Sequence, residues 1–481
     1  MKRILLTILL TVVLCSAWYS PAGADDSQGK KLYNGWCAQC HGYDGDAKSY
    51  TDKFSVPKPR DFTMGTYKFR STPSGDPPTD ADITKVVRDG NPGTSMPPWD
   101  RFTDDEVKAI VAHVKTFAPD AFKDAGKPIT IGTPPKASAD LIAKGKELFN
   151  KAKCVECHGT AGRGNGEKGW QDNFKNDWGD SIMPADYTHP WELRNGSAVE
   201  DIYRTISVGL SGTPMTSYMD SLKDEDRWAL AVFIKSLQQQ RKLGVALKVK
   251  KAASIPAKAD DPAWDSVEFM DLPMGGQLMF EPRDFTPLIT NVRVRGLYTD
   301  KELAFMVEWS DKKPNNGSDG KPADSIWIQF PVKVTEAVEK PYFFMGDKKH
   351  PVFLWNWKAS AAGDVVEQIA KGNENVEDLP KKDVTVITSY NDGLYRVVYK
   401  RALKTGGKDD FEVIPGKFVP FSIAAFDGQN GESGIKGAVS AWYYLMLEPS
   451  TPLKVYVLPP LVALFVLVGG VSLSRSLKSK K

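Results

Sequence analysis

Residues 37–41 read Cys37-Ala38-Gln39-Cys40-His41, and residues 154–158 repeat the pattern as Cys154-Val155-Glu156-Cys157-His158. Two thiols three positions apart can each add across one vinyl group of haem, and the residue that follows then lies under the ring. An imidazole at that place can bind iron, so we expect two covalent haem c groups with His41 and His158 as iron ligands. C-x-x-C pairs in exported proteins also form disulfides or zinc sites, but the histidine directly after each pair argues against both.

The two motifs lie in two copies of one repeated unit. A similar tetrapeptide precedes each motif, a three-residue echo follows it, and each copy ends in a segment with apolar residues at helical spacing. The paired segments are 31–34 with 147–150, 61–63 with 186–188, and 104–117 with 223–237. We therefore expect two all-α domains over residues 25–120 and 138–240, joined by a linker over residues 121–137.

A methionine follows each motif at nearly the same distance. Met96 lies 55 residues after His41, and Met215 lies 57 residues after His158, each in a loop rich in Gly and Pro. A loop methionine beside proline presents its thioether on a stiff backbone, so we expect Met96 and Met215 to be the second axial ligands. Ligation by His and Met fills both axial positions and raises the reduction potential. The layout of helix, C-x-x-C-H, methionine loop and closing helix resembles class I cytochrome c domains.

Other polar residues of the repeat give weaker signals. Arg70 and Arg194 occupy matching positions and could grip haem propionates bidentately, although solvated surface arginines are an equal alternative. His113 stands where the second copy has phenylalanine, so we do not expect it to be a ligand. His189 and His350 are expected to be ordinary surface histidines.

Length, charge and the N-terminus limit the classes of function. The chain has 481 residues and a net charge of +3, and it has no basic run that would follow a phosphate backbone, so nucleic acid is not expected as a partner. Residues 1–24 have the basic, apolar and small-residue regions of a secretory signal peptide. A lipidated Cys15 is the alternative reading, but Leu14 is bulky where a small residue is wanted.

The C-terminus carries an uncharged apolar run. Residues 455–473 have no charged side chain and are followed by a basic tail over residues 474–481. A run of this length can cross a hydrocarbon core, and basic residues after it favour a cytoplasmic tail. We expect a single transmembrane helix that holds the protein on the periplasmic side of the cytoplasmic membrane. A buried C-terminal helix is the alternative.

Between these ends the pattern changes from helical to strand-like. A linker over residues 241–263 is followed, in residues 264–450, by several short alternating segments and by the hairpin signal Asp392-Gly393. Many short strands without cysteine predict an antiparallel β-sandwich. The expected fold class is thus multidomain: two all-α cytochrome c domains, an antiparallel β-sandwich and one C-terminal transmembrane helix.

Three segments of the β domain carry a family resemblance. Residues 343–346, 351–358 and 436–442 resemble the haem b domain of ethylbenzene dehydrogenase, which also serves as gamma subunit of related molybdenum enzymes, and the resemblance covers residues 265–449. It implies one non-covalent haem b held between Met345 and Lys436. Lysine binds iron only as the neutral amine, which requires desolvation. Other methionines compete with Met345 for this role: Met270, Met274, Met279, Met306 and Met446.

The resemblance implies an electron-transfer subunit without substrate chemistry of its own. In that family a molybdopterin subunit does the chemistry and an iron–sulfur subunit passes electrons to haem b; here two haem c groups would relay them to a cytochrome or terminal oxidase. The fusion of cytochrome c units resembles gamma-type subunits of nitrite oxidoreductases and departs from the usual single-domain subunit. An autonomous dihaem cytochrome c shuttle and a dihaem peroxidase remain alternatives.

Overall fold

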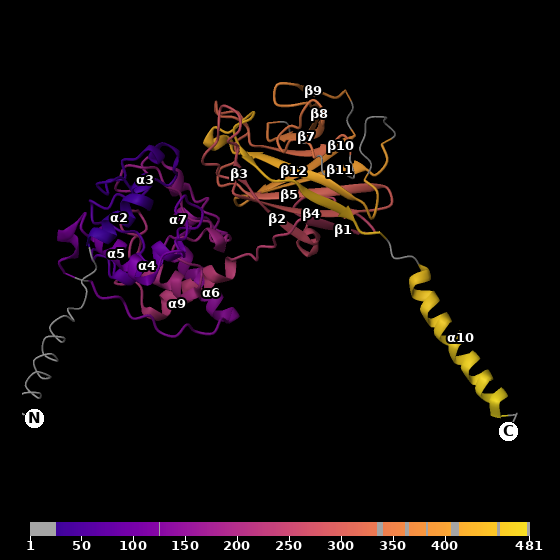
Figure 1. Ribbon diagram of the computed structural model, residues 1–481, viewed down its shortest axis with the longest axis horizontal. Coiled ribbons are helices and arrows are strands. Elements are labelled where there is room, and N and C mark those ends of the chain that lie inside the picture. Colours follow the sequence, from indigo (N-terminus) through magenta and orange to yellow (C-terminus); the bar gives the residue numbers. More distant parts are fainter. Residues whose placement is uncertain are drawn as a thin grey trace, which may run out of the picture.

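The computed structural model describes residues 26–124, 126–333, 340–360, 365–380, 383–405, 413–449 and 453–478. Two helical units occupy one side of the molecule, a large β domain follows, and the C-terminal helix extends away from it (Figure 1). The signal-peptide prediction for residues 1–24 and the alternative at Cys15 fall outside the described residues.

The helical units have matching elements in the same order. In the first unit the helices are α2 (Asp26–Trp36), α3 (Ala38–His41), α4 (Asp80–Asp89) and α5 (Asp104–Lys115), with the 3₁₀ turns η1 (Tyr50–Phe54) and η2 (Pro119–Phe122). In the second they are α6 (Ala139–Lys151), α7 (Val155–His158), α8 (Val199–Val208) and α9 (Asp224–Leu237), with η3 (Glu167–Trp170) and η4 (Pro190–Glu192). The repeat found in the sequence is therefore also a repeat in structure.

The first and last helices of each unit cross in close contact because a glycine lies at the crossing. A Cβ atom at Gly29 would come 2.2 Å from the carbonyl oxygen of Ala109 on α5. A Cβ atom at Gly145 would come 2.2 Å from the carbonyl oxygen of Ala229 on α9. Any larger residue at these two places would push the helices apart. The crossing fixes the turn that leads into each C-x-x-C-H motif.

The β domain is one hydrogen-bonded sheet that folds back on itself. Its path runs β10-β11-β5-β4-β1-β14-β12-β6-β7-β8-β9, with β2, β3 and β13 attached at its sides. The strands are β1 (Ala246–Lys251), β2 (Phe269–Pro273), β3 (Gly275–Gly276), β4 (Asn291–Tyr298), β5 (Glu302–Ser310), β6 (Ser325–Pro331), β7 (Val352–Lys358), β8 (Val365–Ala370), β9 (Val376–Asp378), β10 (Val384–Asn391), β11 (Leu394–Ala402), β12 (Phe418–Phe426), β13 (Ala438–Val439) and β14 (Tyr443–Leu447), and η5 (Pro262–Ser266) and η6 (Gly428–Asn430) are 3₁₀ turns.

The fold-back comes from β12, which pairs with β14 through residues 418–421 and with β6 through residues 422–426. The two halves then face each other across an aromatic core. Phe305 of β5 packs edge-on against Phe421 of β12, and Trp355 of β7 stacks with Tyr399 of β11. This aromatic core holds the two halves of the folded sheet together.

Two details of the β domain correct the sequence prediction. The segment 241–263, expected as a linker, contributes β1 to the centre of the sheet. The sheet is not purely antiparallel, because β1 pairs in parallel with both β14 and β4. The alternation of Leu247 and Val249, both buried, with lysines explains why this short basic segment becomes a strand.

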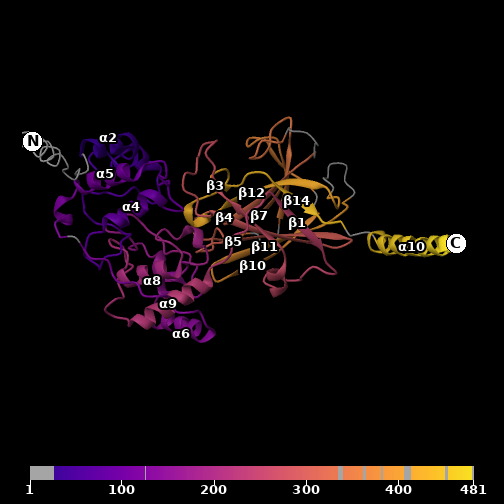
Figure 2. The same cartoon turned by 60° about the horizontal axis from the view of Figure 1, so that its bottom comes forward.

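The predicted transmembrane helix over residues 455–473 is wrong. These residues form part of α10 (Leu453–Lys478), which points away from the β domain (Figure 2). Within the described parts of the chain, no helix combines the length and apolarity needed to cross a membrane. Pro459 and Pro460 lie inside α10, and the uninterrupted stretch after them, residues 461–473, is shorter than the ~20 apolar residues of a spanning helix.

Candidate haem sites

The two histidines of the C-x-x-C-H motifs are held in the same way. His41 Nδ1 lies 2.9 Å from the carbonyl oxygen of Arg60, and His158 Nδ1 lies 3.2 Å from that of Ala185. A carbonyl partner at Nδ1 sets the tautomer that leaves Nε2 for a metal. Burial lowers the pKa of His41 and lowers that of His158 to about 4, so both rings are neutral near pH 7. Neutral imidazole is the form that binds iron.

An aromatic ring lies flat against each histidine. Phe62 stacks on His41 with ring centroids 4.6 Å apart, and Tyr187 stacks on His158 at 4.3 Å. Phe62 and Tyr187 are the middle residues of the repeated segments 61–63 and 186–188. In both segments the aspartate accepts hydrogen bonds from the backbone N–H and the hydroxyl of the threonine two residues later. The repeated segment thus forms one wall of the pocket beside each histidine. The two units differ here in one group, because Tyr187 carries a hydroxyl and Phe62 does not. This hydroxyl lies 3.0 Å from His158 Nε2, the nitrogen expected to bind iron.

The four motif cysteines form no disulfide with one another, which leaves all four sulfurs for thioether bonds. Cys37 and Cys40 lie three residues apart around the single turn α3, and Cys154 and Cys157 lie likewise around α7. Residues at this spacing point from the same face of a helical turn. Burial raises the pKa of Cys37 and of Cys154 to about 11. Both pairs fit two-point attachment of a haem beside the histidine that follows.

The methionine loops have matching backbone geometry. The backbone N–H of Met96 donates to Thr94 Oγ1 at 3.1 Å, and that of Met215 donates to Thr213 Oγ1 at 3.2 Å. Each loop leaves a helix through a glycine with positive φ, Gly90 or Gly209, where a Cβ atom would come within 2.8 Å of the returning loop backbone. Both methionines are half-buried.

Each methionine loop returns to its own cysteine pair. In the first unit Trp99, three residues after Met96, packs edge-on against Trp36, which directly precedes Cys37. In the second unit Tyr218, three residues after Met215, lies close enough to Cys154 and Cys157 for their charges to add to burial in raising its pKa. The structure therefore brings each predicted methionine loop beside the motif it was paired with.

The two candidate propionate partners differ. Arg70 is 2 % exposed and donates to the carbonyl oxygens of Pro73 and Val208, while its second terminal nitrogen, Nη1, is buried without a hydrogen-bond acceptor. A buried guanidinium nitrogen without an acceptor fits a nearby carboxylate. Arg194 has an exposed side chain, although burial lowers its pKa as it lowers that of Arg70. The matching sequence positions therefore differ in exposure.

The helical units contact each other through Trp178. The guanidinium of Arg60 lies 3.8 Å from the centroid of the Trp178 ring, and the ammonium of Lys68 lies 5.6 Å from it. A Cβ atom at Gly212, in the Met215 loop, would meet this ring at 2.5 Å. Arg60 is also the residue whose carbonyl holds His41. One indole thus touches the proximal side of the first site and the methionine loop of the second.

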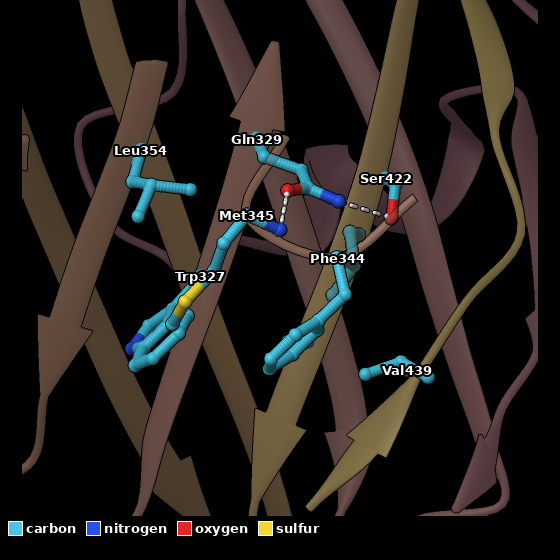
Figure 3. A pocket seen from close by; sticks show the side chains of 9 residues that line it. Trp327, Gln329, Phe344, Met345, Leu354, Ser422 and Val439 are labelled. Carbon is cyan, nitrogen blue, oxygen red and sulfur yellow. Dashed lines mark hydrogen bonds between the residues drawn. The ribbon is translucent and has the colours of Figure 1, made fainter. Parts of the chain in front are cut away.

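The β domain has a separate apolar pocket, which contains Met345 (Figure 3). The backbone N–H of Met345 donates to Gln329 Oε1 at 3.0 Å, and Gln329 Nε2 donates to Ser422 Oγ at 3.0 Å. Met345 is 4 % exposed and has φ of 58°, a left-handed conformation that costs a non-glycine residue about 1–2 kcal/mol. The lining side chains include Trp327, whose Nε1 is buried and unpartnered. Strain at a buried methionine points to a functional constraint.

Lys436 lies at the edge of the same region. It is half-buried, its Nζ is 3.5 Å from the carbonyl oxygen of Asn430, and it directly precedes β13, whose Val439 lines the pocket. The preceding Ile435 packs on the apolar cluster that contains Met345. Of the competing methionines, Met270 and Met274 belong to the main core, Met306 lies in another cluster, and Met279 is 55 % exposed. Met345 and the unpartnered indole N–H of Trp327 thus line the pocket itself, whereas Lys436 lies outside its lining.

The second helical unit also contacts the β domain. Lys312 Nζ donates to the carbonyl oxygen of Pro184 at 2.9 Å, and Asp392 accepts from Thr160 Oγ1 at 2.5 Å. Glu192, which accepts from Thr290, lies 3.4 Å from His189 Nδ1. His189 is only 9 % exposed, so the expectation of a surface histidine is wrong. Its buried carboxylate neighbours explain why a polar ring is tolerated there.

Several of these residues gave no signal in the sequence. Arg60 precedes the echo segment, and its matching residue is Ala185, so only its backbone is shared between the units. Trp178, Lys312 and Glu192 act through partners far away in the chain, which no local spacing encodes.

Comparison with known protein families agrees with this division of the chain. Residues 24–114 match the family model described as cytochrome c oxidase, cbb3-type, subunit III, and residues 142–238 match that of cytochrome c. Residues 261–382 match the ethylbenzene dehydrogenase model. The first two matches contain His41 with Met96 and His158 with Met215, whereas the third contains Met345 and ends before Lys436.

Individual relatives cover parts of the chain. A Haloferax mediterranei protein named as a respiratory nitrate reductase haem subunit is 26 % identical over 196 residues, covering 40 % of this chain and 69 % of that protein. The chlorate reductase subunit gamma of Ideonella dechloratans is 27 % identical over 146 residues, and the match covers 30 % of this chain but 59 % of that subunit, less than two thirds of its length.

A solved structure, the reducing HAO-like protein complex of Kuenenia stuttgartiensis, contains a chain with 36 % identity. The match covers 44 % of this chain and 96 % of that one, with a TM-score of 0.42. The family matches and the paired site geometry lead to one conclusion. The chain joins two cytochrome c domains to a domain of the ethylbenzene dehydrogenase family, and its cofactors are two covalent haem c groups and one haem b.

Proposed function

We propose that this chain is the electron-transfer subunit of an oxidoreductase complex and does no substrate chemistry itself. The observation that carries the proposal is that each haem site offers side chains for both axial positions: His41 with Met96, His158 with Met215, and Met345 with Lys436. A haem iron with two protein ligands has no position left for a substrate. It therefore accepts and donates electrons only.

The axial ligands are part of the proposal. The histidines are supported by their carbonyl partners and stacked rings, and the methionine loops by their return to the cysteine pairs. Met345 is supported by its strained, buried backbone in the apolar pocket. Lys436 is half-buried beside that pocket and directly precedes the short strand β13.

The catalytic partner is inferred from the relatives. Two of them are named as subunits of nitrate and chlorate reductases. By this analogy a molybdopterin subunit acts on the substrate and an iron–sulfur subunit exchanges electrons with haem b; the analogy rests on the family and not on a contact in this chain. The cytochrome c units would exchange electrons with a soluble cytochrome or terminal oxidase. The signal-peptide pattern of residues 1–24 supports a place outside the cytoplasm.

The second helical unit is proposed as the middle carrier. It contacts the β domain through Lys312 and Asp392, and it contacts the first unit through Trp178. The first unit also contacts the β domain, since the ring centroids of Phe54 and Phe285 lie 4.7 Å apart, so the proposal rests on the hydrogen bonds of the second unit and not on an exclusive contact. The first unit would then be the exit, or the point of arrival, for the external electron carrier.

Replacement of Lys436 tests the proposal. In the full-length chain, Lys436→Ala should abolish the haem b signal in a pyridine haemochrome assay and leave two haem c groups. Dithionite should still reduce both haem c groups, while their reduction through the catalytic partner should slow by at least an order of magnitude. The matched control Lys358→Ala, at an exposed lysine at the end of β7, should keep all three haems. Full haem b content in the Lys436 variant would contradict the assignment.

A further inference from the structure

A buried glutamine braces the loop that carries Met345 (Figure 3). Gln329 lies on β6 and is 6 % exposed. Its Oε1 accepts from the backbone N–H of Met345 at 3.0 Å, and its Nε2 donates to the carbonyl oxygen of Phe343. The same nitrogen donates to Ser422 Oγ on β12 at 3.0 Å. One side-chain amide therefore holds the residues on both sides of Phe344 and ties them to β12.

The backbone conformation of Met345 depends on such support. Its φ of 58° is left-handed, and the next residue, Gly346, has φ of 62°. Successive left-handed residues belong to no regular helix or strand, so their backbone polar groups need partners of their own. The N–H of Met345 has Gln329 as its partner, and its carbonyl oxygen accepts from the backbone N–H of Gly372 at 2.9 Å. Both backbone groups of this candidate ligand are thus held by other segments.

A second buried glutamine braces the loop that carries Lys436. Gln277 directly follows β3 and is 1 % exposed. Its Nε2 donates to the carbonyl oxygen of Ile435 at 3.0 Å, and its backbone N–H donates to that of Gly437 at 2.9 Å. These are the two residues on either side of Lys436. The second candidate ligand of haem b is therefore held in a similar manner to the first.

The two braces are joined through Phe280. Gln277 Oε1 accepts from the backbone N–H of Phe280 at 2.7 Å, and Gln277 Nε2 donates to the carbonyl oxygen of Phe280 at 3.0 Å. The ring of Phe280 packs against that of Phe344, with centroids 6.3 Å apart. Phe344 lies between the two residues that Gln329 holds. A continuous set of contacts therefore connects the two loops.

The burial of two amides in this region calls for an explanation, because a buried amide is costly unless its nitrogen and oxygen find partners. The side chain of Gln277 donates twice and accepts twice, and that of Gln329 donates twice and accepts once. Satisfied polar groups inside a protein make their surroundings rigid and specify one arrangement. Each amide directs bonds to residues beside a candidate iron ligand, so the arrangement that they specify is that of the ligand loops.

We propose that Gln329 and Gln277 are positioning residues of the haem b site, which hold Met345 and Lys436 where both can bind iron. This inference rests on the proposed function, because it takes these two side chains as the axial ligands. Loss of a residue that supports a metal ligand typically lowers the affinity or activity of the site about 10–100-fold. A loop that loses its brace should therefore release its ligand from the iron.

Carbon monoxide binding tests the Met345 side in the reduced, full-length, haem-loaded chain, because carbon monoxide needs an open axial position on the iron. Gln329→Leu should raise the share of haem b that binds carbon monoxide at least ~10-fold and leave both haem c groups closed. A glutamine that served folding alone would change the unfolding temperature and leave haem b closed. The control Gln368→Leu, at a half-buried glutamine of β8, should bind as little carbon monoxide as the unmodified chain.

A milder and a stronger variant complete this test. Ser422→Ala removes one partner of Gln329 but keeps the bond to Met345, so it should open haem b to a smaller extent, and it decides the outcome if Gln329→Leu holds no haem b. Met345→Leu removes the candidate ligand and should open or release haem b. If Met345→Leu leaves haem b bound and closed, the ligand assignment of the proposed function fails. If it opens or releases haem b while the brace variants that hold haem b keep it closed, the positioning role is overturned.

Haem b retention tests the Lys436 side. Gln277→Leu should release haem b to an excess of apomyoglobin at least ~10-fold faster than the unmodified chain, and both covalent haem c groups should stay. Gln368→Leu should release haem b at the unmodified rate. An unmodified rate in Gln277→Leu would exclude Gln277 as a positioning residue, whereas unchanged haem b binding in Lys436→Ala would instead contradict the proposed ligand.

Discussion

The two cytochrome units share one internal plan but have different surroundings. Each has a glycine at the helix crossing, a carbonyl and an aromatic ring on its histidine, and a methionine loop closed by a threonine. The second unit contacts the β domain through hydrogen bonds, while the first unit contacts it through the rings of Phe54 and Phe285. The proximal ring is Tyr187 in the second unit where the first unit has Phe62. The repeat therefore gives both units the same candidate iron ligands, while the contacts outside it differ between the units.

The largest expected effect comes from removing one methionine ligand at a time. Met96→Ala and Met215→Ala should each convert one haem c from low-spin to high-spin and lower its reduction potential on the order of 200 mV, part of the ~0.8 V range that axial ligands span. The other haem c should keep its potential. Spectroelectrochemical titration of the full-length variants measures both. If a variant left the reduction potentials of both haem c groups unchanged, the replaced methionine would not be an axial ligand.

A smaller effect is expected from the helix crossings. Gly29→Ala should destabilise the first unit and Gly145→Ala the second by roughly 1–3 kcal/mol, because the added methyl group collides with a backbone carbonyl of the facing helix. Gly35→Ala, in the same helix as Gly29 but with open space around it, should instead stabilise the first unit by roughly 0.5–1 kcal/mol. Denaturant unfolding followed at the haem absorbance gives these values. Equal changes for Gly29→Ala and Gly35→Ala would contradict the crossing geometry.

The smallest effect concerns pH and only the second unit. Burial alone would lower the pKa of His189, but its hydrogen bond to Glu192 and the charges of Asp186 and Glu192 outweigh burial and the nearby Arg163, and they raise it. Burial would raise the pKa of Glu192, but His189, Thr290 and Lys312 lower it to about 2.

A histidine with a raised folded pKa gives stability that is complete below its unfolded pKa of about 6.5 and is lost as pH rises through the folded value. The lowered pKa of Glu192 gives stability that is complete above about pH 4.5, its ordinary pKa, and is lost only as the pH falls towards 2. We expect the second unit to lose a small part of its stability as pH rises above 7, and His189→Gln to remove this loss. Met64, at the matching place of the first unit, is exposed and cannot titrate. A loss of the same size in the His189 variant would contradict the assignment.

The sequence could predict whatever the repeat encodes locally. The C-x-x-C-H turns, the methionine loops and the echo segments are short, and each appears twice, so their roles follow from spacing and comparison. The β-strand over residues 246–251 was missed because four lysine or alanine positions hide two buried residues, Leu247 and Val249. The close approach of the buried carboxylates Asp311, Asp324 and Asp427 could not be predicted, because they come from separate loops that only the folded sheet brings together.

The apolar C-terminal run shows the opposite limit. Its composition suggested a membrane span, but Pro459 and Pro460 lie inside the helix, and the structure has no described helix that meets the requirements. His189 was misjudged for a related reason: its polar neighbours in the chain suggested exposure, while Glu192 and the β domain bury it.

Electron paramagnetic resonance of the fully oxidised, full-length chain tests the central claim most directly, that protein side chains fill both axial positions of every haem iron. The account predicts low-spin ferric signals for the two haem c groups and the haem b, with no high-spin ferric signal. A stoichiometric high-spin signal from any of the three haems would reveal an open iron position and contradict it.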